Sequence, residues 1–184
     1  MRAILRTAVI VGLLAAVAGC IGTSEEIFGP DAAAVVPGIE GSYTQQGGDQ
    51  DDVVTVEAIS GTRDYAYFNP KDRERDRGRM RAVSFGNEMY VLQMRDDTWP
   101  QGRYWQLLLR VVRQNGSIKS VVVLWPEDDA VAALAVKDGI ELGPPGEGDA
   151  FGPKTLKGSR AAIAAFLKSL ASLPLREVAT YVRN

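Results

Sequence analysis

The chain has 184 residues, of which 46% are hydrophobic and 24% are charged, and its formal net charge is −2. That length and apolar content suit one folded domain and exclude a mostly unfolded chain. The sequence contains one Cys and no His. These counts exclude Ser-His-Asp and Cys-His catalytic groups, zinc sites that use His, intrachain disulfides and CxxC redox pairs.

The first twenty residues have the features of a secretory signal. Arg2 and Arg6 precede an uncharged apolar run, which ends in small residues. The apolar run is shorter than the roughly 20 residues that a membrane-spanning helix needs. The last four residues of this segment resemble the lipobox of bacterial lipoproteins: Val17, Ala18, Gly19 and Cys20.

The lipobox resemblance implies cleavage before Cys20 and attachment of acyl chains such as palmitate to this residue. Two or more acyl chains anchor a protein stably, whereas one binds only marginally. We therefore expect a signal peptide at residues 1–19, an acylated Cys and tether at 20–37, and a single β-rich domain at 38–184. In Gram-negative lipoproteins an Asp after the Cys favours inner-membrane retention. We expect a lipid-anchored protein of the cell envelope, and if the source is Gram-negative, Ile21 in that position implies the outer membrane, facing the periplasm.

Residues 38–126 contain short β-type runs separated by turn residues. Asn115-Gly116 separates two runs rich in Leu, Val and Ile, which is typical of a two-residue hairpin. The register from that turn predicts a core face of Leu107, Leu109, Val111, Ile118, Val122 and Leu124.

A second hairpin, with a three-residue loop at 86–88, would place on one face Met80, Ala82, Tyr90, Leu92 and Met94. Its other face would carry Arg79, Arg81, Gln93 and Arg95 beside Val83, Phe85 and Val91. Weaker strand-like runs lie at 39–44, 53–59 and 65–68.

Helix signals occur only in the last third of the chain. Acidic residues before 130–137 and Gly139 after it predict a short helix. Ser159 is the expected N-cap of a second, amphipathic helix, in which we expect Phe166 to be buried against the sheet. The full apolar stripe of that helix is Ile163, Phe166, Leu167 and Leu170. Residues 143–158 are rich in Gly and Pro and predict a loop, and 177–183 could form an eighth strand that pairs with an exposed edge.

These elements predict a mainly β (α+β) fold, an antiparallel meander that forms a small barrel or a curved sheet of about eight strands with a packed helix. The stretch Val-Pro-Gly-Ile-Glu-Gly-Ser-Tyr at 36–43 is similar to the G-x-(W/Y) start of lipocalin domains, with Tyr43 in the place of the Trp. The chain thus resembles lipocalins and lipocalin-like bacterial lipoproteins of similar size. The resemblance implies an architecture and specifies no ligand.

Two groups of residues are candidates for binding. Aromatic residues on the predicted strands could line a ligand cavity, although such residues also serve as ordinary core. The main candidates are Tyr43, Tyr90 and Trp105, and the others are Tyr65, Tyr67, Trp99 and Tyr104. Residues 71–81 alternate six basic with three acidic residues. Within that stretch Arg73, Arg75 and Arg77 could form an anion-binding loop, and the alternative is a solvated loop whose charges pair locally.

No local motif indicates catalysis or a cofactor. The sequence lacks a phosphate-binding Walker loop, a Rossmann fingerprint and an HExxH zinc motif, so we predict no catalytic residue, metal or cofactor. The mildly acidic charge also argues against nucleic acid as a partner.

We expect a non-catalytic, membrane-tethered domain that binds a small apolar ligand or an envelope protein. The alternatives are a carboxylate-dependent envelope hydrolase and a structural accessory subunit of an outer-membrane assembly. An apolar cavity would favour a small ligand, and a filled core with an exposed apolar patch would favour a partner.

Overall fold

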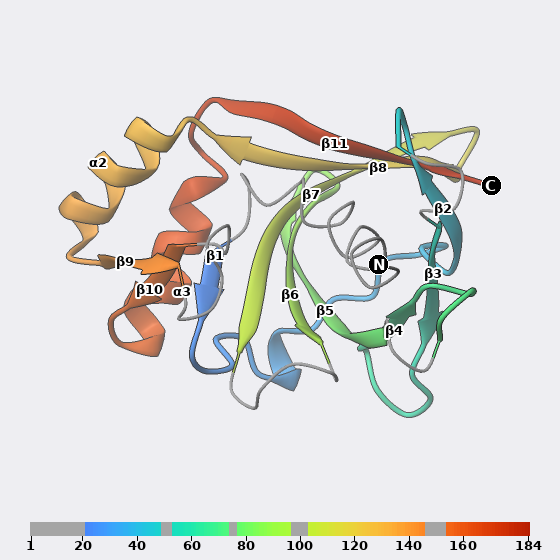
Figure 1. Ribbon diagram of the computed structural model, residues 1–184, viewed down its shortest axis with the longest axis horizontal. Helices are drawn as coiled ribbons and strands as arrows, with labels where there is room; N and C mark the ends of the chain where they lie inside the picture. Colours follow the sequence, from blue (N-terminus) through green and yellow to red (C-terminus); the bar gives the residue numbers. More distant parts are fainter. Residues whose placement is uncertain (1–20, 49–52, 74–76, 97–102, 146–153) are drawn as a thin grey trace, which may run out of the picture.

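Eight of the strands that the structure describes close into one antiparallel barrel (Figure 1). The computed structural model describes residues 21–48, 53–73, 77–96, 103–145 and 154–184. The barrel strands are β2 (Gly41–Gln45), β3 (Val53–Ala58), β4 (Tyr65–Phe68), β5 (Arg77–Gly86), β6 (Met89–Asp96), β7 (Tyr104–Gln114), β8 (Ser117–Pro126) and β11 (Leu175–Arg183). Each strand from β2 to β7 pairs with the strand that follows it in the chain, so the series ends at β8. β11 then pairs with both β8 and β2 and closes the barrel. The predicted fold class is confirmed, and the sheet is a closed barrel rather than an open, curved sheet.

The hairpin of β5 and β6 has the predicted faces. Met80 lies opposite Met94, and Ala82 lies opposite Leu92. The side chains that point into the barrel are those expected from the alternation, namely Met80, Ala82, Tyr90, Leu92 and Met94. The loop is shorter than expected because a register shift near Ser84 leaves a two-residue turn. That turn consists of Asn87 and Glu88, which have φ angles of 51° and 58°.

The hairpin of β7 and β8 departs from the predicted register by one residue. Its turn at Asn115-Gly116 is as expected, but Lys119 is an extra residue on β8 between the paired residues Ile118 and Ser120. Such a β-bulge turns every later side chain to the opposite face of the strand. The predicted core face is therefore wrong beyond the bulge, where the interior holds Val121 and Val123 and the outer side holds Val122 and Leu124.

Two helices and a small extension of the sheet lie beside the barrel (Figure 1). The helices are α2 (Asp128–Asp138) and α3 (Arg160–Leu170), and the extension consists of β1 (Ile21–Thr23), β10 (Lys154–Lys157) and β9 (Glu141–Pro145). Both helix predictions are confirmed. Gly139 ends α2 with a φ of 66°, and the Ser159 hydroxyl caps α3 by accepting the Ala162 N–H at 3.2 Å. Residues 143–158, expected to be a loop, instead include the end of β9 and all of β10, because their few residues pair across the sheet despite the Gly and Pro content.

The barrel wall separates two apolar cores. The inner core lies inside the barrel and includes Tyr43, Tyr90 and Leu109. The outer core lies between the outer side of β5 to β8 and the covering elements, and α3 supplies Ile163, Phe166, Leu167 and Leu170 to it. Phe166 is 0% exposed, so the predicted buried stripe of α3 is confirmed.

Residues 21–37, expected to be a tether, belong to the folded domain. β1 pairs with the start of β7 on one side and with β10 on the other. Ile21, Ile27 and Phe28 are 5% exposed or less and join the outer core. We call residues 21–33 the strap. The tether expectation failed because isolated apolar side chains, without a helical or strand period, fasten this segment to strands that are distant in sequence.

Candidate functional site

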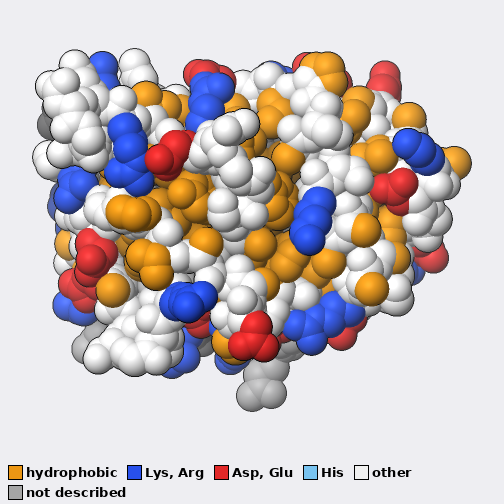
Figure 2. All heavy atoms as spheres, turned by 180° about the vertical axis from the view of Figure 1, so that it is seen from behind, with side chains coloured by type: hydrophobic (Ala, Val, Ile, Leu, Met, Phe, Trp, Pro, Cys, Tyr) orange, Lys and Arg blue, Asp and Glu red, His pale blue; other side chains and the backbone are white. Residues whose placement is uncertain are grey.

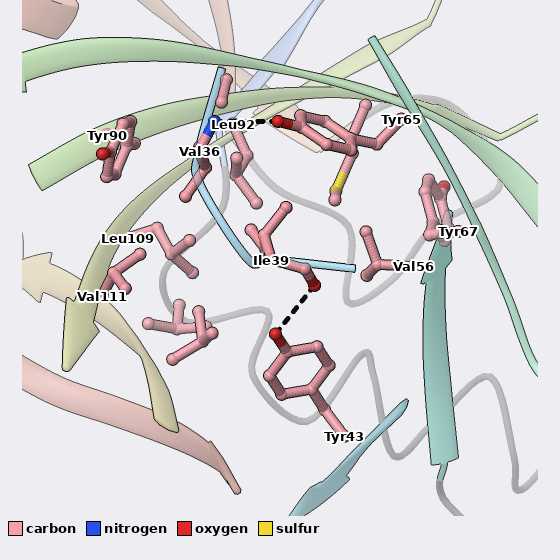
Figure 3. Close-up of a cluster of buried hydrophobic side chains, with 14 of the residues drawn as sticks. Val36, Ile39, Tyr43, Val56, Tyr65, Tyr67, Tyr90, Leu92, Leu109 and Val111 are labelled. Carbon is pink, nitrogen blue, oxygen red and sulfur yellow. Dashed lines mark hydrogen bonds between the residues drawn. The ribbon is translucent and has the colours of Figure 1, made fainter. Parts of the chain in front are cut away.

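The interior of the barrel contains the predicted aromatic residues. Tyr43 and Tyr90 are buried among the inner-core side chains, and Trp105 packs against the same core while remaining partly exposed. Of the other predicted aromatic candidates, Trp99 lies outside the described residues. Figure 3 shows Tyr43 and Tyr90 together with two further candidates, Tyr65 and Tyr67, around a central aliphatic group. Strand alternation identifies all of them as inward-facing once the register is known.

A separate piece of chain contributes side chains to this interior. Residues 34–40, which we call the inserted segment, precede β2, and the side chains of Val36 and Ile39 lie in the inner core. The exposed residues of the segment are Val35, Pro37, Gly38 and Glu40. Figure 3 shows Ile39 at the centre of the cluster. Val36 and Ile39 are 1% and 2% exposed. Two phenols bind the backbone of the segment: Tyr65 Oη accepts the Val36 N–H at 2.8 Å, and Tyr43 Oη donates to the Ile39 carbonyl at 2.8 Å.

Two arginines fasten the inserted segment from the rim of the barrel. Arg113 donates to the Pro37 carbonyl at 2.9 Å, and Arg183 donates to the carbonyls of Gly38 and Glu40, each at 2.7 Å. Gly38 has a φ of 75°, in the left-handed region that favours glycine, where the segment turns. Two of the interior tyrosines, Tyr43 and Tyr65, therefore bind a segment of the chain itself.

Burial changes the acidity of two interior phenols. Burial raises the pKa of Tyr43, and the nearby guanidinium groups of Arg183 and Arg113 oppose that rise. Burial also raises the pKa of Tyr90, and the negative charge of Glu88 adds to the rise. Both side chains are thus neutral hydrogen-bonding groups near neutral pH, as structural phenols in a core usually are.

A second polar cluster lies on the outer side of the barrel, under the strap. Arg81 of β5 binds both carboxylate oxygens of Asp64, at 2.7 and 2.6 Å, and also binds Glu26 and the Phe28 carbonyl of the strap. Hydrogen bonding to Asp64 raises the pKa of Arg81, and this effect outweighs burial, which lowers it. The cluster holds two carboxylates on one cation and ties the strap to the barrel.

Two glutamines continue this cluster across the sheet. Gln93 lies opposite Arg81 on one side and opposite Gln106 on the other. Its carboxamide oxygen accepts the N–H groups of Ile27 and Phe28 at 2.8 and 2.9 Å. Gln106 is buried and donates to the Thr23 hydroxyl at 3.3 Å, while its own carboxamide oxygen has no partner among the described residues. These contacts stabilise the strap.

The structure describes two of the three arginines of the predicted anion-binding loop, and both neighbour Phe68. Arg73 stacks on the ring of Phe68, 4.1 Å from its centroid, and forms an ion pair with Glu57 at 2.9 Å. Arg75 lies outside the described residues. Arg77 is exposed on β5, on the outer side of the barrel. Arg73 therefore pairs locally, and the anion-binding loop stays a prediction.

The fold brings two further arginines next to Arg77, of which Arg79 belongs to the basic run at 71–81 and Arg95 does not. Arg79 follows on the same face of β5, and Arg95 of β6 lies directly opposite Arg79. Both side chains are exposed. The predicted hairpin register already placed the two on one face, so that register was the signal for this juxtaposition.

The predicted lipobox, with Cys20 as the acylation site, lies outside the described residues. Within the described ranges no helix is long and apolar enough to cross a membrane. In the same part of the chain, no three His, Cys, Asp or Glu side chains are grouped so that they could hold a metal ion.

In comparisons with protein-family models, with curated proteins and with solved structures, nothing matched this chain.

Proposed function

We propose that this protein is a lipid-anchored, non-catalytic domain of the bacterial envelope that binds a partner through the outer surface of its barrel. The observation that carries the proposal is the filled interior. The Val36 and Ile39 side chains of the inserted segment lie in the inner core, where a barrel of this size would accept one small ligand, and two phenols and two rim arginines hold the segment's backbone. A structural accessory subunit of an outer-membrane assembly is one form of the same function.

The outer surface that remains for a partner is mixed rather than strongly apolar. Figure 2 shows apolar side chains across the rear face, interrupted by separate basic and acidic groups. The large hydrophobic residues that are exposed in the described chain are Val35, Val136 and Val182. A surface that mixes apolar and charged side chains in this way suits a non-obligate interface.

The arrangement of carboxylates supports the non-catalytic part of the proposal. Glu26 and Asp64 converge from different segments, as an acid/base pair would, but both bind Arg81. The contact that both carboxylates make with Arg81 ties the strap to β5. This structural role explains why the two carboxylates lie close together, and it requires no catalytic function. A carboxylate-dependent hydrolase would instead need two carboxyl groups that face a substrate cleft.

The anchoring part of the proposal rests on the lipobox at residues 17–20. Cys20→Ala removes the thiol that would be acylated, so we expect an unprocessed precursor and no incorporation of labelled palmitate in the natural host. The matched control is Thr23→Ala, which leaves the lipobox intact. Normal processing and labelling of Cys20→Ala would overturn lipid anchoring without affecting the argument from the filled barrel.

A small apolar ligand is the second candidate, and a specific observation favours it. The interior accommodates the Val36 and Ile39 side chains of the inserted segment in addition to the wall side chains. Titration of the full chain with the apolar fluorophore N-phenyl-1-naphthylamine distinguishes the candidates. We expect no saturable binding to the wild type. Saturable binding that Ile39→Trp abolishes would support a ligand that displaces the inserted segment, and would contradict surface binding as the main function.

A further inference from the structure

Three arginines on the outer wall of the barrel have no partner among the described residues. They are Arg77 and Arg79 on β5 and Arg95 on β6, and all three side chains are exposed. Every other arginine in the described part of the chain has an interaction partner: Arg63, Arg73, Arg81, Arg103, Arg110, Arg113, Arg160, Arg176 and Arg183. The arginines without a partner are thus gathered in one place, which we call the arginine patch.

The register makes the patch electrostatically unfavourable in the absence of a ligand. Arg79 and Arg95 are directly opposite each other in the antiparallel pair, so their Cα atoms are separated by about 4.5–5.5 Å. Like charges in that position destabilise a sheet. On the other side of Arg79, β4 presents the small side chain of Ala66, which leaves the two guanidinium groups accessible.

Three acidic side chains near the patch in the described part of the chain, namely Glu57, Asp64 and Glu26, are engaged by other arginines. Glu57 lies one strand beyond Ala66 and forms an ion pair with Arg73. Arg81 follows Arg79 by two residues on β5 and binds both Asp64 and Glu26. The sequence therefore supplies partners for the arginines on both sides of the patch and supplies none, within the described residues, for the patch itself.

We propose that the arginine patch is a binding site for a phosphate group, held between Arg79 and Arg95 with Arg77 beside it. A guanidinium group is planar, always charged and presents a fork of donors that matches phosphate oxygens. Two forks on opposed strands can bind one phosphate from two sides, which replaces their mutual repulsion by two charge-assisted contacts. The inference rests on the β5–β6 register and does not depend on lipid anchoring or on the filled interior.

The test uses the full chain in the neutral detergent dodecyl maltoside, with the arginine side-chain N–H resonances as the readout. Inorganic phosphate and short-chain phosphatidylglycerol are the two probes, and chloride at matched ionic strength is the control. We expect saturable shifts of the Arg79 and Arg95 signals. Equal affinity for both probes would identify a free phosphate ligand, and an affinity at least about tenfold higher for the lipid, or 1.4 kcal/mol, would identify a headgroup.

Variants separate a binding site from a structural role. Arg79→Gln and Arg95→Gln should each lower the affinity for phosphate about tenfold or more, whereas Arg110→Gln, an exposed arginine paired with Glu177, should change it less than twofold. Because each patch variant removes a like-charge contact, its melting temperature without ligand should not fall below that of the wild type. Absence of shifts with both probes, unchanged affinity in Arg79→Gln, or a lowered melting temperature of that variant would overturn the proposal.

Discussion

Arg81 joins the strap to the barrel through charges that are largely withdrawn from water. Its side chain is 10% exposed, and those of Asp64 and Glu26 are 20% and 40% exposed. Removing the cation leaves two carboxylates without their partner, so Arg81→Met should lower the free energy of unfolding by about 3 kcal/mol, the lower end for a broken buried pair. Urea unfolding at neutral pH measures this.

The control for Arg81 is an exposed ion pair on the same barrel. Arg110→Met removes the partner of Glu177, and both of those side chains are more than 40% exposed. We expect a loss below about 1 kcal/mol for this variant. Equal losses in Arg81→Met and Arg110→Met would contradict the buried character of the Arg81 cluster.

Tyr43 should make the stability of the protein depend on pH in the alkaline range. Burial raises its pKa above the ordinary value of 10.0, so the folded state keeps the phenol proton more tightly than the unfolded state. This contribution to stability is complete below pH 10.0 and is lost as pH rises through the folded-state pKa. Tyr43→Phe should therefore lose stability less steeply above that pH than the wild type does.

The same substitution also removes the hydrogen bond to the Ile39 carbonyl. At neutral pH we expect Tyr43→Phe to be less stable by about 1 kcal/mol. Urea unfolding at a series of pH values measures both effects, and Tyr104→Phe, at a half-buried position on β7, is the control. If the free energy of unfolding falls equally steeply at alkaline pH in Tyr43→Phe and in the wild type, groups other than Tyr43 cause the pH dependence.

At the scale of elements, α3 tests the packing of the outer core. Phe166 is 0% exposed and packs in the cluster with side chains from the outer wall of the barrel. Phe166→Ala should lower the free energy of unfolding by about 3–5 kcal/mol, as truncation of a buried Phe commonly does. The exposed residue Lys168, on the same helix, is the control, and Lys168→Ala should change stability by less than about 0.5 kcal/mol.

Elements governed by local signals could be predicted, and those governed by distant contacts could not. The β5–β6 faces followed from alternation, and α3 followed from a cap and an apolar stripe. The bulge at Lys119 has no local signal, because Val121 to Leu124 are all apolar and either register offers an apolar face. β1 of the strap is a strand because it pairs with β7 and β10, and β10 is a strand because it pairs with β1 and β9. The sequence does not reveal these partners locally.

The candidate sites follow the same division. The aromatic residues of the interior could be selected from their place on strands, but the inserted segment could not, because its position depends on Tyr65, Arg113 and Arg183 from distant strands. The basic run at 71–81 identified the region of the arginine patch. The contribution of Arg95 required the pairing of β6 with β5.

At the scale of the whole molecule, closure of the barrel depends on β11. This strand pairs with β8 along most of its length and with β2 at its end. A chain that stops after Leu173 leaves two sheet edges without partners, so we expect loss of the cooperative thermal transition and aggregation. A chain that stops after Arg183 keeps β11 and is the control. A cooperative, soluble Leu173 truncation, followed by circular dichroism and gel filtration, would contradict this role.

The place of β11 in the chain also sets an order of events in time. A chain synthesised or exported from its N-terminus presents β2 and β8 well before β11, and α2, β9, β10 and α3 all come in between. During that interval the edge of β8, with its apolar run from Val121 to Leu124, can pair with another nascent chain instead. Closure of the ring is a contact between segments far apart in sequence and is therefore slow. The protein should depend on a holding chaperone until its final strand arrives, and its yield should respond to export rate more than to equilibrium stability.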